Sequence, residues 1–254
     1  MNLREVIQPA PDWLDKPSPR RVAFVALIAC TGLAFYGFTV GFWRDPVMGL
    51  YVAIKLPVLI ALTLACNGLL NGLLGILLGT GLGFRQSLLA LLTSFALAAL
   101  ILGSLAPITF FLAWNAPSPE SPGASAAHSA YLVTHTALIG FAGITANLHL
   151  HRLLAVKAPT AMAATATLLA WLGGNAFLGA QFSWILRPFF GTPRLAVQFL
   201  RDDPFDGTFH EAVWKALDQL SGGFGLPALL LLMILLTAPI LRTIHKNHQT
   251  TPRP

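Results

Sequence analysis

The chain has 254 residues, of which 55% are hydrophobic and only 10% are charged, and its formal net charge is +6. Soluble domains contain about 25% charged residues, so this composition excludes an ordinary water-soluble protein. The positive charge does not indicate a nucleic-acid partner, because the chain lacks the interleaved aromatic and basic residues of a nucleic-acid groove.

Six segments contain no Asp, Glu, Lys or Arg. Each is at least as long as the ~20 apolar residues that a helix needs to cross a bilayer core of ~30 Å. A soluble helix of that length would carry charge on its outer face. The sequence therefore predicts an all-α, polytopic membrane bundle of about six transmembrane helices, forming one domain over residues 22–244. The charge-free segments are Val22–Trp43, Pro57–Phe84, Gln86–Pro119, Ser121–His151, Ala158–Leu186 and Gln219–Leu241.

The chain begins with residues 1–21, which contain four prolines and are predicted to form an irregular cytoplasmic tail at the membrane surface. The first span is expected at 22–43. A short link, 45–55, then leads to a second span in which Pro57 stands in the first helical turn, where proline is tolerated. The later spans are expected at 87–114, 131–153, 160–182 and 224–244, followed by a cytoplasmic tail at 245–254.

The distribution of charge predicts the orientation. With the N-terminus in the cytoplasm, the inner segments hold ten basic and three acidic residues, a net charge of +7. The outer segments hold six basic and seven acidic residues, a net charge of −1. Because basic residues are retained on the cytoplasmic side, both termini are predicted to be cytoplasmic. The long external loops are then 115–128 and 183–223.

The second span carries a row of small residues with two amides beside it. Small residues at three- and four-residue steps let helix backbones approach closely in lipid, so this row predicts a packing interface. The alternative is that the amides line a polar path, together with the polar residues near the end of the fifth span. The interface residues are Gly68, Gly72, Gly75, Gly79, Asn67 and Asn71, and the polar path would use Asn67, Asn71, Asn175 and Gln181.

The second external connection, 183–223, contains the pattern of an interfacial segment: Trp184, Arg187 and Pro188 follow the fifth span directly. We expect Arg187 to hold this segment to an acidic side chain of the same connection or to a lipid phosphate. Simple snorkelling of the arginine is the alternative. Further on, the capping-box spacing of Thr208 and Glu211 predicts an amphipathic helix over 208–220 on the outer surface.

His135 and His149 lie fourteen residues apart on the fourth span, about 21 Å along a helix. This spacing resembles the paired haem ligands on one helix of b-type cytochromes, so a haem- or metal-binding subunit is a second alternative function. No other span contains a histidine pair, and the sequence predicts neither a metal nor a cofactor. The simplest interpretation of His149 is an interfacial side chain near Arg152.

Motifs for catalysis are missing. The sequence contains no His-Glu-x-x-His, P-loop or Gly-x-Ser-x-Gly pattern, and no Asp or Glu falls within a predicted span. These absences disfavour a membrane-embedded enzyme, and they disfavour a transporter driven by protons through buried acids.

Four stretches of the chain form a recognisable pattern: Ala53–Leu59, Thr63–Leu64, Gln181–Pro193 and Phe209–Trp214. They resemble a family of bacterial multi-pass integral membrane proteins with no assigned activity, and more loosely the Yip-like membrane proteins. The resemblance covers most of residues 50–240 and implies the architecture and a bacterial inner membrane, but no catalytic residue.

Together these patterns predict a non-catalytic subunit or scaffold of a membrane assembly, in contact with the lipid bilayer and with copies of itself or other membrane subunits. A channel or facilitator for a small solute or ion is the alternative.

Overall fold

The computed structural model describes residues 2–15, 17–192 and 196–221, and all regular secondary structure in these residues is helical. The predicted all-helical architecture is confirmed, and five of the described helices are long and apolar enough to cross a membrane. The sixth predicted span, 224–244, and the tail 245–254 lie outside the described residues. The five long helices are α2 (Pro19–Phe42), α3 (Pro46–Leu77), α4 (Phe84–Asn115), α5 (Ala124–Lys157) and α6 (Ala161–Ile185).

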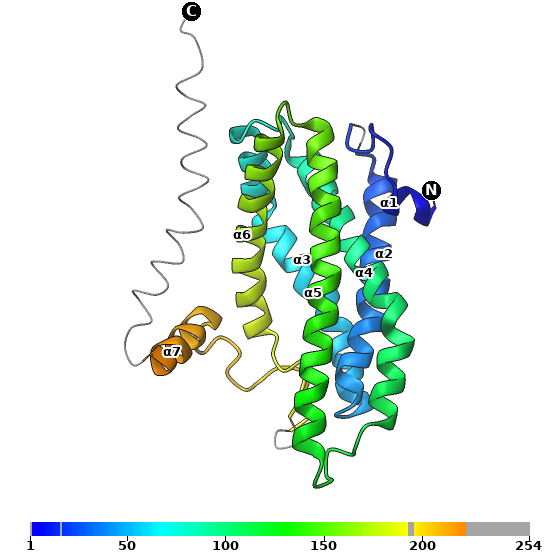
Figure 1. Cartoon of the computed structure of the whole chain (residues 1–254), viewed down its shortest axis with the longest axis vertical. Helices are drawn as coiled ribbons and strands as arrows, with labels where there is room; N and C mark the ends of the chain where they lie inside the picture. The colour runs from blue at the N-terminus through cyan, green and yellow to red at the C-terminus, as the bar shows by residue number, and fades with distance from the viewer. Residues whose placement is uncertain (1, 16, 193–195, 222–254) are drawn as a thin grey trace, which may run out of the picture. The chain divides into compact units, whose positions relative to one another are not determined.

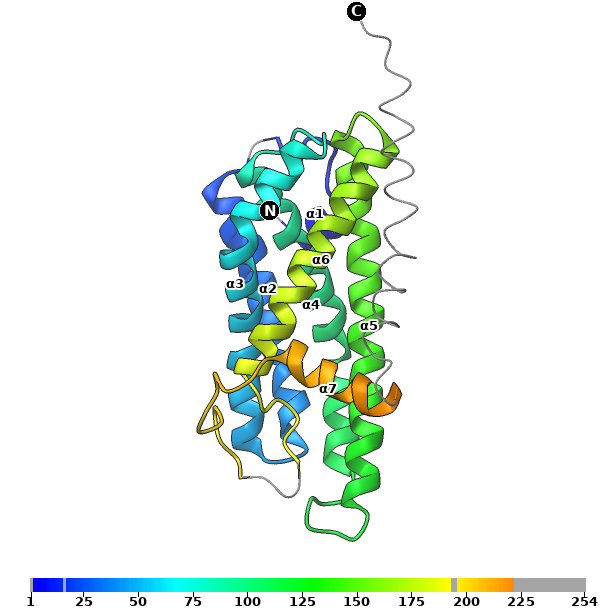
Figure 2. The same ribbon diagram turned by 90° about the vertical axis from the view of Figure 1, so that its left-hand side faces the viewer.

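These five helices run alternately up and down, so successive connections lie at opposite ends of the bundle (Figures 1 and 2). The N-terminal segment, the α3–α4 turn and the α5–α6 turn share one end. We call this the basic end, because Arg21, Arg85, Arg152 and Lys157 belong to these segments. These four of the ten basic residues that the charge pattern assigns to one side therefore lie at one end of the described bundle.

α3 differs most from its prediction, because it begins at Pro46 and not near Pro57. The Asp45 carboxylate caps the helix by accepting a hydrogen bond from the Val47 backbone N–H at 2.7 Å, and proline suits the first helical position. The predicted link at 45–55 is therefore wrong, and Pro57 stands in the helix interior. The helix ends at Leu77, before Gly79 adopts a positive φ of 85° and turns the chain toward α4.

The tightest packing is between α2 and its neighbours α3 and α4, at three glycines of α2. A Cβ atom built on Gly37 would lie 2.6 Å from the Val52 carbonyl oxygen of α3. Gly41 approaches α3 in the same way, and Gly32 approaches the α4 backbone. These contacts need glycine because only hydrogen fits between the backbones.

The predicted irregular N-terminal tail is confirmed only in part: residues 8–15 form turns and irregular structure, but the segment starts with a helix and packs on the bundle. Residues Leu3–Ile7 form a short helix, α1, which Asn2 and Glu5 cap reciprocally. Val6, Trp13 and Leu14 are buried, with at most 3% of each residue exposed. These apolar side chains pack the segment onto the end of the bundle, although its prolines prevent a continuous helix.

The described residues divide into two compact units at Pro204, and the second contains α7 (Phe209–Ser221). This is the helix predicted at 208–220, and the Thr208 hydroxyl accepts a hydrogen bond from the Glu211 N–H at 3.0 Å, as its capping pattern predicts. A hydrogen bond and ion pair with Lys215 one turn later lower the pKa of Glu211 and raise the pKa of Lys215.

Candidate functional site

Three of the four residues of the predicted polar path meet between α3 and α6. The Asn175 side-chain oxygen accepts hydrogen bonds from the amides of Asn67, at 3.1 Å, and Asn71, at 3.3 Å. Asn67 and Asn71 are fully buried, whereas Asn175 is half-buried. The approach is close because α6 has glycine here: a Cβ on Gly174 would lie 2.7 Å from the Asn67 amide nitrogen. Gln181 lies about 9 Å further along α6 and makes no described bond to this cluster.

A cavity of about 210 Å³ lies beside the cluster, between α4, α5 and α6. Its polar lining includes Asn175, Asn147 and Ser94, and its remaining walls are apolar. The Ser94 hydroxyl donates to the Ala146 carbonyl at 3.0 Å, and the Asn147 amide donates to the Gly143 carbonyl at 2.8 Å. The amide groups of Asn147 and Asn175 thus border a space that reaches membrane depth.

The surface of α5 and α6 around this cavity is open. Within the described residues, a Cβ atom on Gly140, Gly143 or Gly173 would have no atom within 4 Å. Only 22% of the most apolar stretch of α5 and 17% of that of α6 is buried, against 56% for α4. We call the surface formed by Gly140, Gly143, Asn147 and Asn175 the α5–α6 face.

The predicted glycine row of α3 packs inside the chain, against the start of α4. A Cβ on Gly72 would lie 3.0 Å from the Phe84 Cα atom, and one on Gly75 would lie 3.0 Å from the Leu82 carbonyl oxygen. A Cβ on Gly68 would lie 3.2 Å from the Phe84 ring. Gly79 has a different role, because its positive φ forms the turn between the two helices. These neighbours belong to the α3–α4 connection.

At the end opposite the basic end, the segment after α6 folds back onto α3 through a buried lysine. The prediction that Lys55 lies in an external link is wrong, because its position in α3 makes it fully buried. Its ammonium group donates to the Pro188 carbonyl oxygen at 2.6 Å. The rings of Phe189 and Phe199 lie 5.7 and 5.1 Å from the same nitrogen. Sequence reasoning missed this role because an early helix start was not expected.

Arg187 makes its described contacts within its own segment. Its guanidinium carbon lies 3.8 Å above the Trp184 ring, and one of its nitrogens donates to the Trp184 carbonyl at 2.5 Å. Stacking and a hydrogen bond to the last turn of α6 are both suited to a planar guanidinium. The expected tie to an acidic side chain or to lipid stays a prediction.

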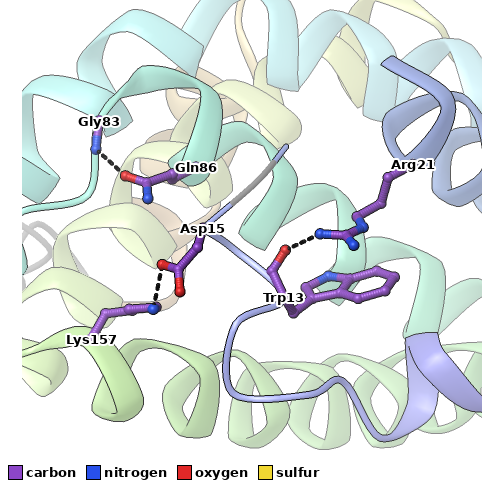
Figure 3. Close-up of polar contacts among 6 residues, drawn as sticks. All are labelled: Trp13, Asp15, Arg21, Gly83, Gln86 and Lys157. Carbon is purple, nitrogen blue, oxygen red and sulfur yellow. Dashed lines mark hydrogen bonds and ion pairs between the residues drawn. The ribbon is translucent and has the colours of Figure 1, made fainter. Parts of the chain in front are cut away.

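Polar contacts fix the N-terminal segment to the basic end, and Figure 3 draws those between Arg21 and Trp13 and between Asp15 and Lys157. The Trp13 indole N–H donates to the Thr93 hydroxyl of α4 at 3.1 Å. Arg21 donates to the Trp13 carbonyl at 2.6 Å, and its guanidinium lies 4.5 Å above the same indole ring. Asp15 forms an ion pair with Lys157 at the end of α5. In the same view, the Gln86 side chain accepts from the Gly83 N–H at 3.0 Å and so caps α4.

The histidine pair does not form a common site. His135 is fully buried, its Nδ1 lies 2.7 Å from the Tyr36 hydroxyl, and the rings of Tyr131 and Phe190 lie 4.3 and 5.8 Å away. A porphyrin bound at His135 would have to displace these rings. Within the described part of the chain, no three His, Cys, Asp or Glu residues gather as metal ligands do.

His149 is not the interfacial side chain expected from its position, because the N-terminal segment covers it and leaves 8% of the residue exposed. It lines a cavity of about 240 Å³ between residues 7–14 and the end of α5. No pattern in the sequence indicates this cavity directly, because its walls come from segments more than 130 residues apart.

No protein-family model matches this sequence, and comparisons with curated proteins and with solved structures find no match either. The resemblance of residues 50–240 to a family of bacterial membrane proteins therefore stays a prediction.

Proposed function

We propose that the protein is a non-catalytic subunit of a bacterial inner-membrane assembly, which binds a transmembrane helix of another subunit or of a second copy on its α5–α6 face. In this proposal the chain crosses the membrane six times, with 224–244 as the last span, and both termini are cytoplasmic. Activity would then depend on assembly and not on a reaction carried out by this chain.

The observation that carries the proposal is the open α5–α6 face. Between lipid tails and leucine side chains there is no hydrophobic driving force, so helices associate in membranes where small residues permit close packing and amides form hydrogen bonds. The face offers both, because Gly140 and Gly143 leave open space among the described residues and Asn147 and Asn175 lie beside them. A lipid-facing surface needs neither feature.

The test is purification of the full chain from native membranes in mild detergent, with Gly143→Leu compared with Cys30→Leu. Cys30 is exposed on α2, so its variant makes a similar small-to-large change elsewhere on the bundle surface. We expect a stoichiometric partner or a second copy to be lost with Gly143→Leu and retained with Cys30→Leu. A monomer without a partner, or an assembly that survives Gly143→Leu, contradicts the proposal.

A second measurement separates an external partner from the chain itself. A cysteine placed at Gly143 is paired with single cysteines along 224–244 and oxidised in membranes. A disulfide within one chain would show that the protein covers its own face, and would overturn the docking proposal.

The orientation is tested independently of the partner. Cysteines at Ser121 and Thr192 should react with an impermeant thiol reagent in spheroplasts, whereas one at Thr251 should not. The opposite labelling pattern would reverse the topology without affecting the docking proposal.

A facilitator for a small solute is the alternative, and the asparagine cluster beside the 210 Å³ cavity favours it. The amides of Asn67 and Asn71 donate to the Asn175 oxygen, so the cluster satisfies part of its own hydrogen bonding without a solute. Solute flux into liposomes that contain only this protein, abolished by Asn175→Leu, would support the facilitator in place of the subunit.

A further inference from the structure

The cavity at the basic end, between the N-terminal segment and the end of α5, has features of a binding site. Its volume of about 240 Å³ far exceeds the ~10–15 Å³ that one water requires. One wall is apolar and includes Pro9, Leu14 and Val156. The other carries three groups that can be positively charged: His149, Arg152 and Lys157.

His149 is the side chain that most needs a ligand. More than nine-tenths of it is buried, and neither ring nitrogen makes a hydrogen bond with any described residue. The backbone of Ile7 lies beside the ring but not in hydrogen-bond geometry. Buried polar groups in proteins are nearly always hydrogen-bonded, because an unpaired one loses its interactions with water without replacement. Both nitrogens point away from the accessible space of the cavity, so the ring must turn before it can donate to a bound anion from a protonated nitrogen.

Arg152 adds a permanent positive charge at the cavity. It lies one helical turn after His149, so the two side chains project from the same side of α5. It is exposed and makes no hydrogen bond or ion pair with any described residue. Lys157, in contrast, is paired with Asp15. The charge available to a ligand is therefore that of Arg152.

We propose that this cavity binds the phosphate head group of an anionic phospholipid: Arg152 contacts the phosphate, the ring of His149 turns to donate to it, and the apolar lining contacts the glycerol and first acyl carbons. Arginine is suited to phosphate because its planar fork makes two parallel hydrogen bonds. Basic pockets at the cytoplasmic ends of membrane helices are suited to anionic head groups. The proposal does not depend on the α5–α6 face, which belongs to other residues.

A lipid bound in this cavity should stabilise the packing of the N-terminal segment on the bundle. The segment supplies the apolar wall and is itself held by the Trp13 and Asp15 contacts with α4 and α5. A lipid in the cavity would touch both the segment and α5. Binding should therefore stabilise the docked segment, since a ligand that binds only the folded arrangement raises its stability.

In the experiment, the purified full chain is titrated in neutral detergent with short-chain phosphatidylglycerol. The midpoint of thermal unfolding is measured at each lipid concentration. Phosphatidylcholine of the same chain length is the reference lipid. We expect phosphatidylglycerol to raise the midpoint saturably and more than phosphatidylcholine does. Arg152→Gln should weaken its apparent affinity about tenfold, as expected when one charge-assisted hydrogen bond is lost.

Arg85→Gln is the matched control, because it removes the same charge from the basic end outside the cavity lining. If Arg85→Gln and Arg152→Gln weaken binding equally, general surface charge explains the effect and the site is wrong. His149→Leu should also weaken binding. Should that variant fail to fold, Arg152→Gln still decides, since Arg152 is exposed and its change does not disturb the core.

A second titration distinguishes the source of the phosphate. Glycerol 3-phosphate, which has no acyl chain, should leave the unfolding midpoint unchanged at concentrations where phosphatidylglycerol saturates. An equal rise with glycerol 3-phosphate would assign the cavity to a soluble phosphate ester and overturn the lipid assignment.

Discussion

Gly37→Ala should destabilise the bundle, because α2 and α3 are separated there by little more than a hydrogen atom. The new Cβ would lie 2.6 Å from the Val52 carbonyl oxygen and 3.0 Å from its carbonyl carbon. Ordinary C···O contacts begin near 3.3 Å, so the helices must separate by roughly 0.7 Å. Both atoms belong to the backbone of α3, so no side-chain rotation can relieve the contact.

A separation of this size affects the whole interface. A gap of ~0.5–1 Å forfeits a quarter to a half of each dispersion contact along the two helices. Overpacked cores lose about 1–3 kcal/mol, and alanine regains at most ~1 kcal/mol as a better helix former. In a chain of this size, each kcal/mol corresponds to about 2–4 °C, so the midpoint of unfolding should fall by roughly 5 °C.

The assay is thermal unfolding in one detergent at one protein concentration, with Gly140→Ala as the control. Gly140 has no atom within 4 Å of a built Cβ among the described residues, so its variant should unfold at or slightly above the wild-type temperature. Two results would refute the reasoning: Gly37→Ala unfolding at the wild-type temperature, or both variants falling equally.

Three further substitutions test other contacts. Gly72→Leu should lower the unfolding midpoint more than Gly37→Ala does, because a whole side chain must enter the contact between α3 and the start of α4; a wild-type midpoint would remove this packing assignment. Lys55→Met retains volume but leaves the Pro188 carbonyl without its donor, so trypsin should cleave the connection after α6 faster, and unchanged cleavage would show that the aromatic contacts suffice. Arg187→Lys loses the stack on Trp184 and should also speed cleavage; protection equal to that given by arginine would reduce this residue to an interface marker.

The membrane architecture could be predicted from the sequence because it depends on composition over long windows. Charge-free segments locate four of the five described spans to within about one or two turns of their ends. α3 is the exception: its start was predicted at Pro57, whereas the helix begins at Pro46, directly after its N-cap residue Asp45. Its earlier start moves Lys55 from an external link into the bundle, where its carbonyl partner lies 133 residues away.

The candidate sites could be predicted only in part, for a physical reason. The amides of Asn67 and Asn71 are conspicuous in an apolar span, so their involvement in a polar contact was predictable. The predicted polar path already grouped them with Asn175, but which of its residues meet depends on the packing of α6 on α3, which local spacing does not specify. The cavity at His149 was not predictable at all, because prolines in the first residues suggested an irregular tail, whereas the buried Trp13 and Leu14 hold that segment in place.

The glycines of this chain show why a spacing motif alone cannot identify an interface. Glycines recur at three- to five-residue steps in α2, as Gly37 and Gly41, and in α5, as Gly140 and Gly143. The α2 pair is closed against α3 inside the chain, whereas the α5 pair has open space among the described residues. A glycine lowers the stability of a helix relative to alanine. At Gly140 and Gly143, no close contact among the described residues offsets that loss. That difference in surroundings, and not the motif, makes the α5–α6 face the place to look for a partner.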